Sequence, residues 1–176
     1  MSLRAPTEWL RRQPATAPSS RAQPQRRGLL LCSSRADRKW VERLTRVLAP
    51  LLQGTGQELR LWDESTFQPR HSWREEIATA LAEAKVALLL VSPNFLASKF
   101  VMLQELPKLL AAAEADGGRV LWVSLSPCLV EHTPIGEYQA LLPPGQSLDG
   151  LVWLRRQQAL KTIAQGTHAA LLGFSP

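Results

Sequence analysis

Residues 85–91 read KVALLLV, a run that is apolar at every position after the lysine. A strand with one face in water alternates apolar and polar residues, whereas a run without polar residues is typical of a strand buried on both faces of a parallel sheet. Parallel strands are joined by crossovers that usually contain a helix. The stretch therefore predicts a layered α/β domain.

Four further segments have strand character, and helical segments alternate with them. They lie at 29–34, 57–62, 119–125 and 150–154. After Asp37, apolar residues recur with helical spacing, and Asp37 is expected to cap this helix. A second predicted helix begins at the S-x-x-E capping box of Ser72 and Glu75. Further helices are expected through the segment that contains Glu105 and over 157–171.

Five strands alternating with helices predict one parallel sheet covered on both faces. Right-handed crossovers then favour a flavodoxin-like, doubly wound five-stranded sheet with strand order 2-1-3-4-5. Ligands of such sheets lie beyond the carboxyl ends of the strands, where the winding reverses, here between the first and third strands. The polar stretches SSRAD (33–37) and SPNF (92–95) follow those two strands.

The positive charge of the chain is concentrated at its start. The net charge is +6, and residues 1–28 hold six Arg against one acid, Glu8, so the rest is nearly neutral and has no basic footprint for nucleic acid. We expect residues 1–27 to be a disordered, basic, Pro/Arg-rich tail and residues 28–176 to be one domain. A mitochondrial transit peptide has a similar composition, but four prolines favour a tail.

Several kinds of site are not indicated. No apolar run reaches about 18 residues, so no membrane helix is expected. Cys32 and Cys128 lie far apart, which predicts free thiols in a reducing compartment. Cys32 is expected to be a buried small hydrophobic residue. Neither the two Cys nor the three His have metal-ligand spacing. The motifs of P-loop, Rossmann and serine-hydrolase sites are absent from the sequence.

The segment FVMLQEL (100–106) contains one carboxylate, Glu105, among apolar residues. Periodicity alone favours a solvated or boundary glutamate, with Lys108 available as an ion-pair partner one turn along the helix. Its position after the third strand, beside the predicted crevice, favours a functional role instead. The loop WDESTFQPRHSW (62–73) has the same two readings: Asp63 and Glu64 are ribose-binding acids or ordinary loop acids.

The segments LLLCSSRADRKWVERLTRVLAPL, LWDESTFQPRHSWREEIATALAEAKVALLLVSPNFLASKFVMLQELPKLL and RVLWVSLSPCLVEHTPIGEYQAL resemble a bacterial TIR (Toll/interleukin-1 receptor) domain over about residues 28–172. The most specific parts are W-D-x(8–9)-W-R-x-E-I and S-P-x-F-L-A-S-x-F…E-L. The resemblance implies a flavodoxin-like fold. It also implies an NAD+ glycohydrolase that releases nicotinamide and forms ADP-ribose or a cyclic product, as an effector of anti-phage defence.

The resemblance also assigns roles to residues. It implies that Glu105 is catalytic, although some relatives place the glutamate where Gln104 stands, four residues after Phe100. It implies substrate binding by residues near the strand ends, and an assembly loop that mediates TIR–TIR contacts. The substrate-binding set is Ser33, Ser34, Arg35, Trp62, Asp63 and Phe100, and the assembly-loop set is Phe67, Pro69, Arg70 and Trp73.

Two departures from the family pattern favour a second hypothesis, a non-catalytic TIR–TIR scaffold or adaptor. Ser33 stands where an aromatic residue is common, and Arg70 where the loop often has glycine. Under the first hypothesis the partners are NAD+ as substrate, other TIR domains in a homo-oligomer, and a sensor domain or sensor protein. No metal, separate cofactor, nucleic acid or membrane partner is expected, and the expected location is the cytoplasm.

Overall fold

The computed structural model describes residues 26–63, 73–98, 101 and 105–174. Its strands form one five-stranded parallel sheet in the order β2-β1-β3-β4-β5, which confirms the predicted order. The strands are β1 (Leu29–Ser33), β2 (Leu59–Asp63), β3 (Val86–Val91), β4 (Arg119–Ser124) and β5 (Gln139–Ala140). The main helices are α1 (Arg38–Thr55), α2 (Trp73–Glu83), α3 (Pro93–Leu96), α5 (Glu105–Ala115) and α6 (Trp153–Leu172).

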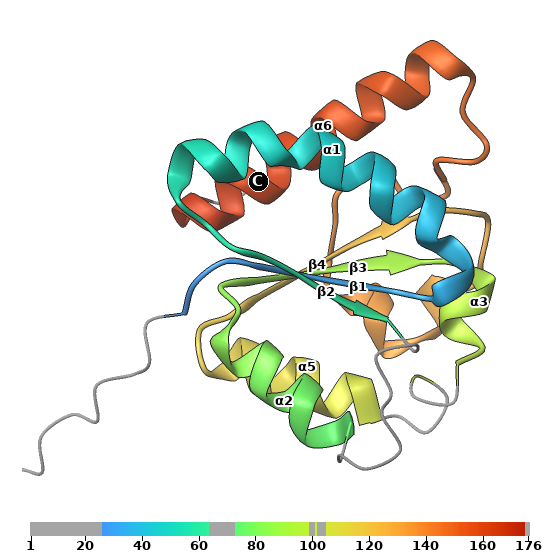
Figure 1. Cartoon of the computed structure of the whole chain (residues 1–176). Coiled ribbons are helices and arrows are strands. Elements are labelled where there is room, and N and C mark those ends of the chain that lie inside the picture. The colour runs from blue at the N-terminus through green and yellow to red at the C-terminus, as the bar shows by residue number, and fades with distance from the viewer. Residues whose placement is uncertain (1–25, 64–72, 99–100, 102–104, 175–176) are drawn as a thin grey trace, which may run out of the picture.

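Two helical layers enclose the sheet (Figure 1). Helices α1 and α6 pack on one face and share a core with alternate residues of the strands, such as Leu29 and Leu31. Helices α2 and α5 pack on the other face, against residues such as Leu30 and Cys32. All six side chains of β3 are buried, as expected for a strand covered on both faces.

The fifth strand was predicted at the wrong place. Residues 150–154 form no strand: α6 begins at Trp153, while Val152, Trp153 and Leu154 are all exposed. A short apolar run does not distinguish a strand from the start of a helix, and here the helix-forming residues that follow extend into it. The actual edge strand, Gln139–Ala140, pairs with Leu121 and Trp122 over only two residues and carries no apolar run that would predict it.

The remaining loops are more structured than the sequence indicates. Two short 3-10 helices, Val130–His132 and Pro134–Glu137, interrupt the proline-containing loop that follows β4. Residues of the SPNF stretch form the short helix α3, ahead of the predicted helix that contains Glu105. Arg26, in the predicted tail, donates hydrogen bonds to Leu81 O and Ala84 O, which ties the start of the described chain to the end of α2.

No helix in the described part of the chain is both long and apolar enough to cross a membrane.

Candidate functional site

Glu105 is the first residue of α5, and its side chain forms a two-point ion pair with Arg74 of α2. Nε of Arg74 donates a 2.7 Å hydrogen bond to Oε2, and Nη2 of Arg74 contacts Oε1. The side chain of Glu105 is 21% exposed, whereas that of Arg74 is 60% exposed. Each carboxylate oxygen therefore faces one guanidinium nitrogen, which fixes the plane of the carboxylate.

This geometry replaces the ion pair predicted from the helix itself. Lys108 is exposed, and Glu105 pairs across the helical layer with Arg74 instead. Leu106, Leu110 and Ala113 form the buried side of α5. Since Glu105 lies just before that stripe at the helix start, it is partly buried and reaches α2, which excludes the fully solvated reading.

A second carboxylate lies at the predicted switch point between β1 and β3. Asp37 is 6% exposed, and its Oδ2 accepts a hydrogen bond of 2.5 Å from the hydroxyl of Ser92, the residue that follows β3. The Ser92 hydroxyl also accepts from the backbone N–H of Phe95 and so caps α3. Asp37 does precede α1, but its side chain makes no capping hydrogen bond, so the predicted cap is wrong. The carboxylate instead joins the segment that follows β1 to the segment that follows β3.

The three predicted substrate-binding residues after β1 differ in accessibility. Ser33 and Ser34 are 3% and 4% exposed, and Ser34 accepts a hydrogen bond of 3.4 Å from Ala36 N–H, whereas Arg35 is exposed. Side chains alternate along a strand, so Ser33 follows Leu29 and Leu31 toward α1. Glu105, in contrast, pairs with α2 on the opposite layer. The structure therefore does not bring Ser33 and Glu105 to the same face.

The predicted residues of the β2 end are described only in part. Trp62 is buried in the core shared with α2 and α5, on the layer that holds Glu105. Asp63 ends β2 opposite Ser33 in the parallel register, and Trp73 begins α2. The other predicted positions lie outside the described residues, namely Glu64, Phe67, Pro69, Arg70, Phe100 and Gln104.

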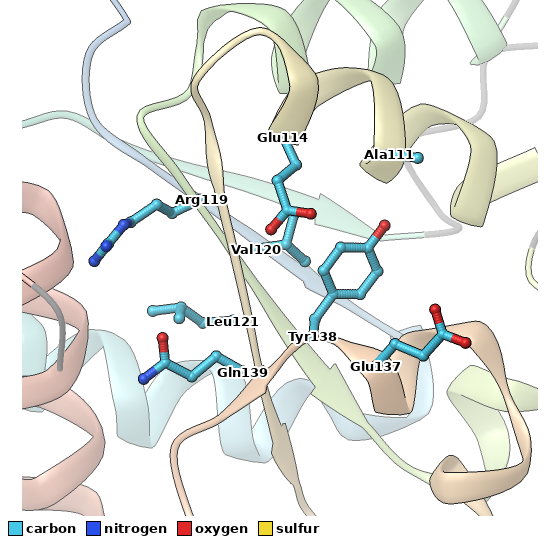
Figure 2. Close-up of a pocket in the computed structure, with 8 residues that line it drawn as sticks. All are labelled: Ala111, Glu114, Arg119, Val120, Leu121, Glu137, Tyr138 and Gln139. Carbon is cyan, nitrogen blue, oxygen red and sulfur yellow. The ribbon is translucent and has the colours of Figure 1, made fainter.

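A separate hollow of about 460 Å³ lies at the opposite end of the sheet (Figure 2). It is lined by the first residues of β4, by Glu114 of α5 and by Glu137 and Tyr138 before β5. Burial raises the pKa of Tyr138, and the charges of Glu114 and Glu137 raise it further. Because parallel sheets bind ligands at the carboxyl ends of their strands, and none of the predicted site residues lines this hollow, it is a poor candidate for the active site.

Sequence reasoning missed the residues that hold the candidate site together. Arg74 belongs to the quoted W-R-x-E-I motif, but nothing in one sequence indicates that it pairs with a residue 31 positions away. Asp37 and Ser92 both occur in the polar stretches that follow β1 and β3, and the predicted strand order was the only signal that could have brought them together. Among the described residues, no group of three His, Cys, Asp or Glu is placed to hold a metal ion.

The chain matches one family model and is similar to several solved structures. Residues 30–161 match the family model of the TIR domain. Similar solved structures include the TIR domain of the Toll-related receptor TRR-2 from Hydra magnipapillata, at 16% identity and a TM-score of 0.44, covering 77% of this chain and 98% of that one. A diflavin flavoprotein A3 from Nostoc is similar at 10% identity and a TM-score of 0.46, covering 85% of this chain and 99% of that one. The comparison with curated proteins finds no match.

Proposed function

Since the chain belongs to the TIR domain family, some of whose members hydrolyse NAD+, we propose that it is an NAD+ glycohydrolase with Glu105 as its catalytic residue. The reaction cleaves the bond between nicotinamide and ribose. Its products are nicotinamide and either ADP-ribose or a cyclic form. The observation that carries the proposal is one partly buried carboxylate, fixed in orientation by Arg74, at the start of α5.

One carboxylate is sufficient for this reaction. Nicotinamide leaves from NAD+ as a neutral molecule because the ring is positively charged while bonded, so no general acid has to protonate it. Bond breaking leaves positive charge on the ribose, in an oxocarbenium-like transition state similar to that of glycosidases. A fixed carboxylate stabilises this charge and can accept hydrogen bonds from the ribose hydroxyls.

The position of Glu105 also suits an anionic side chain. The first turn of a helix carries unpaired backbone N–H groups and the positive end of the helix dipole, which favour a carboxylate there. The start of α5 follows β3, whose carboxyl end borders the switch point of the sheet. We propose that NAD+ enters on the α2/α5 layer from that edge.

The experiment is nicotinamide release from NAD+ by concentrated protein, with and without a crowding agent. Glu105→Gln keeps the size of the side chain but removes its charge, and we expect release to fall at least about a hundredfold, the usual loss when one charge-stabilising group is removed. Glu114→Gln is the matched control, because it changes an exposed glutamate at the other end of the same helix. Absence of nicotinamide release at every protein concentration would contradict the enzymatic function. Equal rates for wild type and Glu105→Gln would contradict the assignment of Glu105.

A second candidate function is that of a non-catalytic scaffold, since TIR domains generally associate with one another. The observation that favours it is the exposed apolar run Val152, Trp153 and Leu154 at the start of α6, with side chains 68%, 70% and 61% exposed. Contiguous exposed apolar side chains are typical of contact surfaces. Under this function, the pair between Glu105 and Arg74 serves only to join α2 to α5.

A further inference from the structure

A cavity of about 600 Å³ lies between α1 and the edge strand β2, on the opposite layer from Glu105. This volume is within the range of small-molecule sites. Its apolar lining includes Val41 and Leu61, and Leu61 is 55% exposed. Its polar lining comes from Ser33 at the carboxyl end of β1 and from successive turns of α1. The cavity therefore combines an apolar wall with polar groups, as ligand sites do.

One hydroxyl group in the lining has no hydrogen-bond partner among the described residues. The hydroxyl of Thr45 is buried and makes no hydrogen bond within the described part of the chain. This is unusual for the helices of this protein, because Thr55, Thr162 and Thr167 each donate to the carbonyl four residues earlier. Ser33, whose side chain also lines the cavity, is 3% exposed. Rotation of Thr45 about χ1 toward a ligand would therefore break no existing hydrogen bond.

The charge around the cavity selects an anion. Arg38 and Arg46 line it together with one acid, Glu42. Arg38 and Glu42 form an exposed pair at 3.5 Å, and such pairs are weak enough for Arg38 to turn toward a ligand. Helices α1 and α6 together carry seven Lys and Arg and only one acid, whereas α2 and α5 carry two basic residues and five acids. The local field and the field of the whole layer thus have the same positive sign.

We propose that this cavity is a second ligand site, which binds an organic phosphate such as a nucleoside monophosphate. The guanidinium groups of Arg38 and Arg46 bind the phosphate, Ser33 and Thr45 donate hydroxyl hydrogen bonds, and the organic part packs on Val41 and Leu61. Arginine is suited to this role because its planar group pairs with two phosphate oxygens at once. Ser33 and Trp62 line this cavity and belong to the substrate-binding set that the resemblance implies, but Glu105 is not part of the lining, so the site does not depend on Glu105 being catalytic.

Isothermal titration calorimetry with AMP, adenosine and inorganic phosphate tests the proposal on the full chain. We expect saturable binding of one AMP, at least about tenfold tighter than binding of adenosine or of phosphate alone, because one charge-assisted hydrogen bond is worth about that factor. Arg46→Gln should weaken AMP binding about ten- to hundredfold, and Thr45→Val several-fold. Melting temperatures of the variants, compared with wild type, establish that each is folded.

Arg43→Gln is the matched control, since Arg43 is an exposed residue of the same helix that stacks on Trp40, 4.9 Å from its ring centroid, and does not line the cavity. Its AMP affinity should change less than about twofold. Four results would each overturn the proposal. They are an equal loss of AMP affinity in Arg43→Gln and Arg46→Gln, equal affinity for AMP and adenosine, equal affinity for AMP and phosphate, and no AMP binding. So would loss of AMP binding in Glu105→Gln, which would place AMP at the other site. Nicotinamide release tests only the proposed enzyme.

Discussion

Replacing Ser92 by alanine should destabilise this domain more than other serine-to-alanine changes. Ser92 is 1% exposed and makes two interactions: its hydroxyl donates to the buried carboxylate of Asp37, and it accepts from Phe95 N–H at the start of α3. A hydrogen bond to a charged group is worth about 1.5–3 kcal/mol. Loss of a helix N-cap costs about 1 kcal/mol more.

The expected free-energy cost of Ser92→Ala is therefore about 2.5–4 kcal/mol, or a fall of about 5–15 °C in melting temperature for a domain of this size. Urea unfolding followed by tryptophan fluorescence measures the free energy of unfolding. Ser98→Ala is the matched control, because Ser98 also accepts from a backbone N–H, that of Val101 at 3.4 Å, and its side chain contacts no carboxylate among the described residues. We expect this control to cost less than about 1 kcal/mol.

A double-mutant cycle isolates the hydrogen bond between the two side chains. The coupling energy between Asp37→Ala and Ser92→Ala should be about 1.5 kcal/mol or more, because each single change leaves the partner group buried without its hydrogen bond. A coupling energy below about 0.5 kcal/mol would refute the reasoning, since the two residues would then be neighbours without a significant interaction. A cost of Ser92→Ala no larger than that of Ser98→Ala would refute it as well.

Two further predictions concern a buried thiol and an exposed indole. Burial raises the pKa of Cys32 from 9.0 to about 12, so between these values the unfolded chain loses a proton that the folded chain keeps, and stability falls as pH rises. Between about pH 7.5 and about pH 10, wild type should lose about 1.4 kcal/mol more unfolding free energy than Cys32→Ala in urea titrations; parallel pH curves would contradict this. Trp153→Ser should change stability by less than about 0.5 kcal/mol but lower any self-association in analytical ultracentrifugation; unchanged association would exclude the α6 start as a contact surface.

The sequence predicted those parts of the fold that rest on burial of whole elements. The apolar run of β3 and the alternation of strands with helices predicted the layered sheet, and right-handed crossovers favoured its strand order. It failed at β5, because two residues that pair at a sheet edge have no hydrophobic pattern to detect. It failed in the same way at residues 150–154, where Val152, Trp153 and Leu154 are exposed. Periodicity reports burial, so it misleads where apolar residues lie on the surface.

The sequence predicted the location of the candidate site but not the contacts within it. Its location followed from the strand order, and Glu105 was singled out by its place after β3 together with the family motif. The partners of its carboxylate and of Asp37 could not be predicted, since contacts between side chains of different elements depend on how the layers pack. The unpartnered hydroxyl of Thr45 is also invisible in the sequence, where threonines in helices all look alike.

The pair between Glu105 and Arg74 constrains how any substrate can use this carboxylate. The guanidinium group occupies one hydrogen-bonding position on each oxygen. A carboxylate has about four such positions, so a ribose hydroxyl can bind at the free ones without displacing Arg74. Displacement would require the substrate to replace a two-point, charge-assisted interaction, whereas sharing leaves the carboxylate oriented. The arrangement in which Arg74 and the ribose share the carboxylate therefore has the lower free energy. In the proposed enzyme, Arg74 is a positioning residue that holds the plane of the Glu105 carboxylate while the ribose binds.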